Sequence, residues 1–473
     1  MVITTKNFKH FNQICANEYG RKVIHTNKVK ITADNLIDEL NKALPIHNQN
    51  AVEINYLDRY YRGDKPVHYR RRTASTRADV NNKIAINFSK MIVDIKTSEL
   101  VGEPVQYVLR GTDEKKSEEV AKLNAIFEGE DKIECDIEIC TWKSICGTAY
   151  RFIGNDSSEG ELLDESPFSL EACDPRYTFV VYYNNNKPAF GCRIVTDENE
   201  ETNYFIYTKS EWFLVKDGSI VNRGINGNGA IPIVEYPNNA RRISDIELTI
   251  DIEDNLNKIA SDRSNDIEQF VSSWIKFLNC DIDKKQFEEM RQLGILSIKS
   301  NNGAENKADV SVLTTELNQT QTEVAVEDLY EDMLLVQGIA NRQGGTSGDT
   351  GSAVSLRNGF YTQEKRSEIL EPVFKKAEKQ ALRIILNRLR IANGFTLLPS
   401  DVEIKISRTK SDNMLTKAEV LQILLTSGIN PARAIKTAGL FSDPEQVAVE
   451  SRERMNVLYP TDMPATEGIN NED

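Results

Sequence analysis

The chain has 473 residues, of which 40% are hydrophobic and 27% are charged, and this is the composition of an ordinary folded protein with roughly two to four substructures. Its 72 acidic residues against 58 lysines and arginines give a net charge of −14, which excludes a tight, general DNA binder because such proteins need basic surface. No run of about 18 apolar residues and no signal-peptide pattern occurs, so we expect the chain to stay in the cytoplasm where it is made. The 7 cysteines lack paired spacing and the 4 histidines all lie in the first seventh of the chain, so we predict reduced thiols and no metal or cofactor.

The first 145 residues are predicted to be largely helical. Residues 1–30 have no clear period and are expected to form an extended arm, and the polar, basic stretch 62–82 is predicted to be a loop. Apolar residues at helical spacing predict helices at 32–43, 52–61, 83–100, 113–128 and 131–144.

Between residues 150 and 236 the pattern changes to short runs of β-branched and aromatic residues separated by polar turns. These runs predict strands at 177–183, 189–195, 202–208 and 211–217. Their spacing of about ten residues indicates an antiparallel meander. Because helix-rich and strand-rich parts follow each other without βαβ alternation, the predicted fold class is α+β.

After residue 240 the pattern is again mainly helical. One helix, straight or bent, is predicted over 241–278, followed by a mixed insert at 279–318 with a short helix and two strands. A helix is then expected at 320–336 and a long one at 352–392, kinked by Pro372, which removes one backbone donor. The remaining elements are a strand at 401–407, helices at 417–426 and 431–437, and a disordered acidic end.

A glycine-rich stretch, NRQGGTSGDTGSAVSLRNGF at 341–360, follows the helix at 320–336 and runs into the start of the helix at 352–392. A phosphate-binding P-loop would need a lysine after the second glycine and a preceding strand, and this stretch has neither. A flexible linker remains possible. A loop held at the exposed end of two packed helices is instead a place for a contact element.

The helix before the glycine-rich stretch carries an acidic stripe. Glu323, Glu327 and Glu331 repeat every four residues, with Asp328 and Asp332 beside them, and each such like-charge pair costs a few tenths of a kcal/mol. Two interpretations of this stripe stay open. It is either a solvated outer face or the wall of an aqueous passage through which another polyanion moves.

Several segments resemble the portal proteins of tailed bacteriophages, in the branch typified by Bacillus phage SPP1. The similar segments are YYRG at 60–63, NNKIAINFSKMIVDIKTSELVGEPVQY at 81–107, SDRSNDIEQF at 261–270 and GSAVSLRNGFYTQEKRSEILEPVFKKAEKQALRIIL at 351–386. The resemblance implies a portal-type α+β subunit with a mixed helix and antiparallel-sheet wing, helical stem, small α/β clip, long kinked helix and helical crown. Such subunits assemble into a ring, usually of twelve copies, with double-stranded DNA passing through its centre.

Carried over in order, the resemblance divides the chain into nine parts. They are an arm at 1–30, the wing at 31–240, a stem helix region at 241–278, the clip at 279–318, a second stem helix at 319–337, a tunnel loop at 338–352, a long wing helix at 353–394, the crown at 395–460 and an acidic tail at 461–473. The tunnel-loop tip that approaches DNA corresponds to Arg342, Gln343, Gly344, Gly345, Thr346, Ser347, Gly348 and Asp349, and the channel-lining candidates are Glu323, Glu327 and Glu331.

The function implied is a non-enzymatic conduit for DNA packaging and ejection at one capsid vertex. Implied partners are copies of itself, DNA, terminase, a head–tail adaptor, and the major capsid and scaffolding proteins. It would lie in the virion, and in the host cytoplasm during assembly. Two alternatives stay open: another capsid-associated interaction protein, and a nucleic-acid-processing enzyme whose carboxylates hold magnesium.

Overall fold

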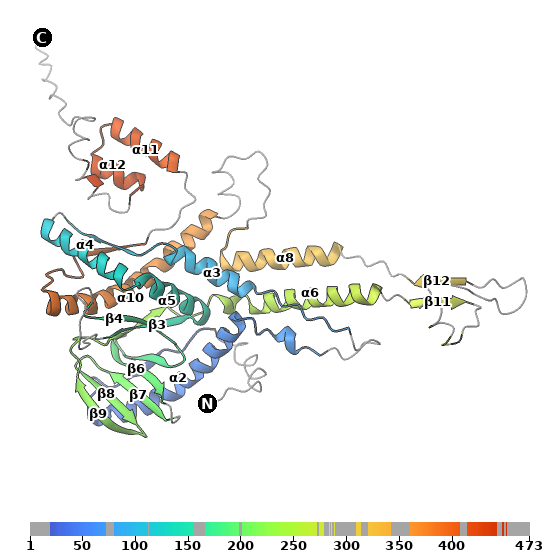
Figure 1. Ribbon diagram of the computed structural model, residues 1–473, viewed down its shortest axis with the longest axis horizontal. Helices are drawn as coiled ribbons and strands as arrows, with labels where there is room; N and C mark the ends of the chain where they lie inside the picture. Colours follow the sequence, from blue (N-terminus) through green and yellow to red (C-terminus); the bar gives the residue numbers. More distant parts are fainter. Residues whose placement is uncertain are drawn as a thin grey trace, which may run out of the picture. The chain divides into compact units, whose positions relative to one another are not determined.

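The computed structural model of the 473-residue chain is shown in Figure 1. It divides into two compact units. The first unit comprises residues 1–58, 90–247 and 360–473, and the second comprises 59–89 and 248–359. Apart from a few isolated positions, the structure describes residues 19–71, 80–111, 113–154, 166–197, 201–271, 274–278, 309–313, 320–341, 360–406 and 414–441.

A six-stranded sheet in the first unit contains the predicted meander. Its strand order is β1-β5-β6-β7-β8-β9, antiparallel from β5 onward, while β1 pairs with β5 in parallel. The strands are β1 Ile24–Thr26, β5 Thr178–Tyr183, β6 Pro188–Thr196, β7 Thr202–Tyr207, β8 Glu211–Lys216 and β9 Ser219–Ile225. Helix α2, Ala33–Tyr61, packs against the sheet and buries Leu36 and Leu40 with Phe190 and Phe213. This sheet and helix share one hydrophobic core.

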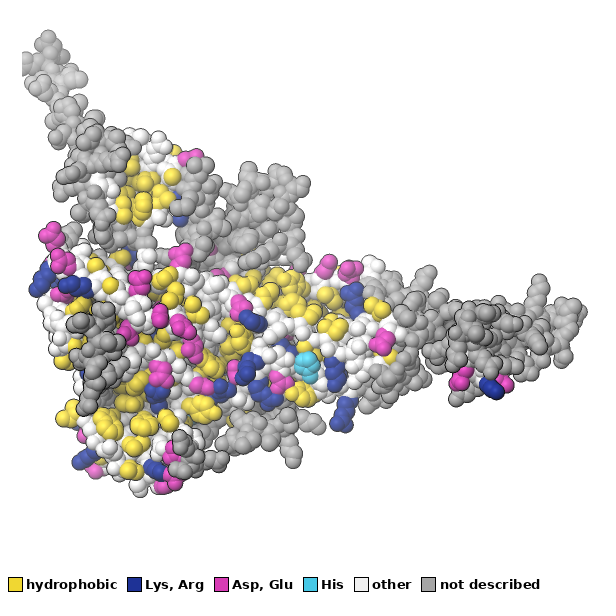
Figure 2. Space-filling view, viewed as in Figure 1, with side chains coloured by type: hydrophobic (Ala, Val, Ile, Leu, Met, Phe, Trp, Pro, Cys, Tyr) yellow, Lys and Arg dark blue, Asp and Glu magenta, His cyan; other side chains and the backbone are white. Residues whose placement is uncertain are grey.

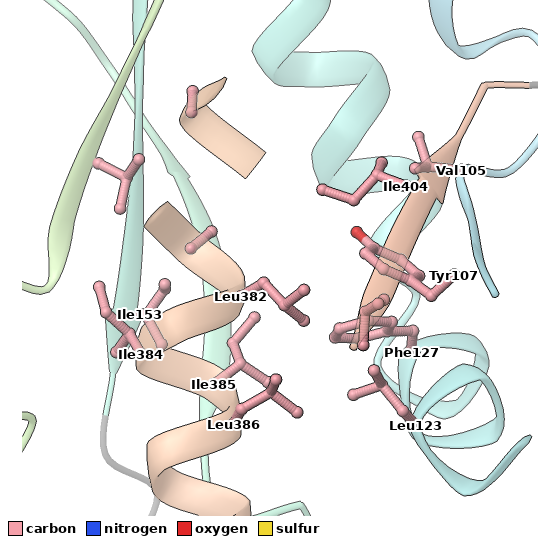
Figure 3. Close-up of a cluster of buried hydrophobic side chains, with 14 of the residues drawn as sticks. Val105, Tyr107, Leu123, Phe127, Ile153, Leu382, Ile384, Ile385, Leu386 and Ile404 are labelled. Atoms are coloured by element: carbon pink, nitrogen blue, oxygen red, sulfur yellow. The ribbon is translucent and has the colours of Figure 1, made fainter. Parts of the chain in front are cut away.

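A second core in the first unit joins segments that are far apart in sequence (Figure 3). Helix α10, Phe360–Asn393, packs on a three-stranded antiparallel sheet of order β10-β3-β4. The other members are α3 Phe88–Val101, β2 Gln106–Leu109, α4 Glu114–Gly129, α5 Lys132–Cys146 and β13 Val402–Lys405, and the sheet strands are β3 Thr148–Gly154, β4 Ser169–Cys173 and β10 Ile233–Pro237. In Figure 3, Leu382 and Ile385 of α10 point toward Tyr107 and Phe127 across this core. Residues near 105, 125, 150 and 385 therefore depend on one another for burial.

A buried polar network crosses the second core. The Glu378 carboxylate on α10 accepts hydrogen bonds from the hydroxyls of Tyr107 and Tyr236, at 2.5 and 2.7 Å. It also pairs with Lys132 Nζ and Arg151 Nη1, both at 3.0 Å. Asp136 on α5 pairs with the same two cations. Because two carboxylates balance two cations, the network keeps α5, α10, β2, β3 and β10 together without a net buried charge.

Gly147 ends α5 in a conformation that few other residues tolerate. Its φ is +82°, and a Cβ at this position would lie 1.9 Å from the carbonyl oxygen of Arg242. Glycine is therefore required for the tight passage from α5 into β3.

The C-terminal part of the first unit contains a small helix pair, α11 Met414–Thr426 and α12 Pro431–Ala438. Asn430 caps α12 by accepting from the backbone N–H of Ala432 at 3.0 Å, and Gly439 ends it in the left-handed region. Figure 2 shows hydrophobic side chains gathered on this pair. Ile423 on α11 is 61% exposed.

The second unit is built on two helices, α6 Ile250–Val271 and α8 Thr320–Gln337, which lie side by side (Figure 1). The side chain of Gln337, at the end of α8, donates to Thr249 just before α6, at 3.2 Å, so the two helices are antiparallel. Along the chain, α6 is followed by the antiparallel pair β11 Trp274–Leu278 and β12 Asp309–Leu313.

The α+β prediction is confirmed in its coarse form, and so are the helices α4, α5, α8, α11 and α12 and the strands β5 to β8, β12 and β13. The prediction of a helix over 241–278 is wrong: α6 ends at Val271, and Trp274–Leu278 is a strand. Trp274 and Phe277 are three residues apart and imitate a helical face, but pairing with 309–313 makes them part of a sheet. The start of the helix predicted at 83–100 is also wrong, because α3 begins at Phe88.

Two further predictions need correction or fall outside the described residues. The two helices expected at 32–43 and 52–61 are one helix, α2, which continues through Pro45. Helix α10 runs through Pro372 as one helix, as expected, and the kink there stays a prediction. Of the short helix expected at 284–293, only Lys285 and Glu288 are described, and both are helical. The strand expected at 295–299 and the helix start at 352–359 lie outside the described residues.

Candidate functional site

The acidic side chains predicted to matter lie on the exposed surface of α8. Glu323, Glu327 and Glu331 are all exposed, and so are Asp328 and Asp332. Helix α8 contains no lysine or arginine, and no ion pair among the described residues involves any of the three glutamates. Asn341 donates to Glu331 Oε1 at 3.2 Å. The helix therefore presents an uncompensated negative surface to solvent.

The predicted tunnel-loop residues, Arg342 to Asp349, lie outside the described residues. The described chain reaches Asn341 on one side and resumes at the start of α10, Phe360, on the other. Arg342 to Asp349 therefore follow the C-terminal end of α8 in chain order.

An extended segment, residues 80–87, lies along α6 and is held by a regular series of side chains. The backbone N–H groups of Asn82, Ile84 and Ile86 donate to Asn265 Oδ1, Ser261 Oγ and Asn257 Oδ1, at 2.6, 2.9 and 2.7 Å. The N–H of Ser89 completes the series by donating to Glu253 Oε2 at 3.1 Å. We call Glu253, Asn257, Ser261 and Asn265 the α6 ladder.

The α6 ladder works because two periodicities nearly match. Every second amide of an extended chain points the same way, about 6.7 Å apart. Side chains four residues apart on a helix lie on one face, about 6 Å apart. All four members of the ladder are at most 2% exposed, so these hydrogen bonds are shielded from water. These hydrogen bonds thereby fix the extended segment 80–87 to α6.

A buried ion pair fixes the start of α6. Lys65 Nζ lies 2.6 Å from Glu253 Oε1, with both side chains fully buried, and sits 3.5 Å above the ring of Tyr60. The Tyr60 hydroxyl donates to Asp254 Oδ1 at 2.9 Å. Burial raises the pKa of Asp254 to about 6, although the hydrogen bond from Tyr60 opposes this shift. Lys65, Glu253 and Tyr60 thus tie the chain before the ladder to the first turn of α6.

Sequence reasoning did not find the α6 ladder. The signal was present as polar residues at every fourth position of α6, opposite an alternating segment, and these are two of the segments that carried the portal resemblance. In this chain, hydrogen bonds from Asn82 and Ile84 to Asn265 and Ser261 join these two segments.

Among the described residues, no group of three His, Cys, Asp or Glu side chains is arranged to hold a metal ion. In the same part of the chain no helix combines the length and apolar character needed to span a membrane. The described cysteines are free, and four of the five are buried. Burial raises the pKa of Cys140 to about 12, which keeps its thiol protonated at neutral pH.

Comparison with known proteins gives a match over most of the chain. The family model of phage portal proteins described as SPP1 Gp6-like matches residues 40–455. The portal protein of Bacillus phage SPP1 is 24% identical over 441 residues, which cover 84% of this chain and 82% of that protein.

Solved structures of gene transfer agent (GTA) particles are also similar. The neck of the native particle, computed with C12 symmetry, gives a TM-score of 0.44 at 10% identity and covers 74% of this chain and 89% of that chain. The virion of the native particle gives a TM-score of 0.43 at 12% identity and covers 82% and 94%.

Proposed function

Because the chain belongs to the SPP1 Gp6-like family of phage portal proteins, as its sequence resemblance indicated, we propose that copies of it form a ring at one capsid vertex. The family is a structural, non-enzymatic component of the virion. The ring conducts double-stranded DNA into the capsid during packaging and out of it during ejection. The observation that carries this proposal is the family match over 40–455, which includes α6, β11, β12, α8, α10 and the pair α11 and α12.

In this ring, α6 and α8 form the stem and Glu323, Glu327 and Glu331 face the channel. Their exposure and lack of cationic partners support this role. Each contact between a cation and a phosphate adds salt-dependent affinity, which would slow the movement of DNA. An acidic wall repels phosphates, so DNA driven by a separate motor passes without being held.

The remaining segments take the roles that the family implies. Residues 279–318 form the clip, 31–240 and α10 the wing, and 395–460 the crown. The tunnel loop, 338–352, brings Arg342 to Asp349 close to the DNA, and its four glycines from 344 to 351 let the tip bend around the channel. The ring of twelve copies docks terminase during packaging and a head–tail adaptor afterward, and contacts major capsid and scaffolding proteins during assembly in the host cytoplasm.

Electron microscopy of the purified chain, with and without its scaffolding protein, tests the ring. We expect negative-stain class averages with a central opening. A chain that stays monomeric under every assembly condition, including with scaffold, would overturn the proposal.

Two variants test the channel in a packaging assay with terminase. Deleting 343–349 is expected to leave rings intact but to abolish packaging or retention of DNA. Reversing Glu323, Glu327 and Glu331 to lysine is expected to preserve rings and to make DNA transport slower and strongly dependent on salt. The matched control reverses three exposed acids elsewhere, Glu114, Glu118 and Glu134, and should package like the wild type. Equal transport by both triple variants would refute the channel assignment.

A further inference from the structure

A cleft of about 690 Å3 lies between β2, α4 and the start of α5, within the first unit. This volume is in the range of about 300–1,000 Å3 that is typical of ligand sites. Its apolar wall includes Tyr107 and Phe127, whose ring centroids are 4.8 Å apart. Neither the core packing nor the proposed channel uses this space.

One wall of the cleft is a sheet edge. In the described part of the chain, β2 pairs with β13 and with no other strand. Just past the end of β2, the Arg110 N–H donates to the Asp401 carbonyl at 2.7 Å. Because backbone amides alternate along an antiparallel strand, Tyr107 and Leu109 point their amides away from β13, toward the cleft that they line.

The side chain of Asn124 on α4 already imitates a peptide group at this edge. Its amide nitrogen donates to the Tyr107 carbonyl at 2.9 Å, and its oxygen accepts from the Tyr107 N–H at 3.4 Å. A neighbouring strand would make the same two kinds of hydrogen bond. Among the described residues, no hydrogen bond uses the amide of Leu109, two residues further along. The edge therefore has room for a main chain beside Asn124.

The charge of the cleft selects for a cation. Three carboxylates line it, on Glu128, Asp131 and Asp136, against one ammonium, on Lys132. Asp136 and Glu378 neutralise Lys132 at 2.6 and 3.0 Å. Glu128 and Asp131 are exposed at the rim, and neither forms an ion pair with any described residue. An arginine or lysine can place its stem along the apolar wall of the cleft and its charge at these rim acids.

We propose that this cleft binds an extended peptide segment of a partner protein that carries arginine or lysine between apolar residues. Its main chain pairs with the free edge of β2 at Leu109, and its cation lies at Glu128 and Asp131. This is strand addition at a sheet edge, with side-chain pockets providing specificity. The cleft lies within one copy of the chain, so it would bind such a peptide whether or not the chain forms rings.

Fluorescence anisotropy with the full-length chain tests the proposal. The probe is a fluorescein-labelled peptide of seven residues in which valine alternates with arginine. One control peptide replaces arginine with glutamate, and a second carries N-methyl groups on alternate amides, which prevents strand pairing. We expect saturable binding of the arginine peptide, weakened by salt, and at least about tenfold weaker binding of both controls.

Variants of the chain locate the binding site. Ala121→Trp fills the cleft from the exposed face of α4 and should weaken binding by more than about tenfold, whereas Ala125→Trp, on the same helix but outside the cleft, should not. Glu128→Gln combined with Asp131→Asn should weaken binding roughly five- to tenfold, and Glu118→Gln should leave it unchanged. The charge variants alter only exposed side chains, so they remain informative if the tryptophan variant fails to fold.

Three results would overturn the proposal. They are equal affinity for the arginine and glutamate peptides, binding that persists unchanged in the Glu128→Gln, Asp131→Asn variant, and no saturable binding at about 1 mM peptide. Full binding of the N-methylated peptide would refute the strand pairing at Leu109.

Discussion

Replacing Glu378 by glutamine tests whether the buried network in the first unit holds together the second core. The substitution keeps the size of the side chain and removes its charge. It leaves Lys132 and Arg151, which are at most 4% exposed, with Asp136 as their one carboxylate. The new amide also turns N–H groups toward side chains that are themselves donors.

The expected cost follows from the burial of these groups. Removing one partner of a buried ion pair destabilises proteins by about 3–5 kcal/mol, because the other charge stays buried without compensation. At roughly 2–4 °C for each kcal/mol, the melting temperature of the first unit should fall by on the order of 10 °C. Glu368→Gln on the same helix is the control, since its pair with Lys365 is half exposed and is worth about 1 kcal/mol or less.

Differential scanning calorimetry or urea unfolding at pH 7 measures this difference, and a pH series adds a second check. Burial alone would raise the pKa of Glu378, but Lys132 and Arg151 outweigh it and hold the pKa well below its usual range. The charged Glu378 therefore stabilises the fold fully at pH values above 4.5, the pKa of this group in the unfolded chain, and the stabilisation is lost as the pH falls below that value. The difference in free energy of unfolding between wild type and Glu378→Gln should therefore become smaller in acid. A loss no larger than that of Glu368→Gln at pH 7 would refute the reasoning.

Two other predictions concern single buried side chains. Asn257→Ala should leave the N–H of Ile86 without its acceptor, which costs about 1–3 kcal/mol locally and speeds hydrogen exchange at residues 82–89. The control Asn255→Ala changes an exposed residue of the same helix and should leave the exchange rates unaltered. Unchanged exchange in Asn257→Ala would argue against the α6 ladder. Burial lowers the pKa of His47 to about 4, so the first unit should lose up to roughly 3 kcal/mol of stability as the pH falls from 6.5 to 4. His47→Gln should flatten that part of the stability profile, and an unaltered slope would show that other groups cause it.

Local patterns in the sequence predicted most helices and the meander, because these elements depend on residues close together in the chain. The run at 211–216 buries Phe213 and Val215 between half-buried neighbours, as a half-buried strand does. In 178–183 the first four residues are all buried, as in a strand inside the core. The portal resemblance was also available from the sequence, since it lies in the order and distance of short segments. The exposed position of Glu323, Glu327 and Glu331 agrees with either interpretation of the acidic stripe.

Two of the wrong predictions, at 274–278 and 83–87, have one physical cause, which is pairing between distant residues. Residues 274–278 carry apolar side chains at helical spacing, and only their pairing with 309–313 makes them a strand. Residues 83–87 have an amphipathic helical pattern, yet two of their amides donate to side chains of α6. The partners of Ile86 and Ile84 lie 171 and 177 residues away along the chain. Local propensity cannot anticipate either outcome, because tertiary partners supply the deciding hydrogen bonds.

The sequence by itself thus determined the α+β class, the helices and strands with strong local periodicity, and membership in the portal family. Only the tertiary structure decided that Lys132, Arg151, Asp136 and Glu378 form one buried network, and that the edge of β2 and the rim acids Glu128 and Asp131 border the same cleft. Charges and amides that are far apart in the chain acquire partners only when folding removes them from water, and that is a property of the packed core.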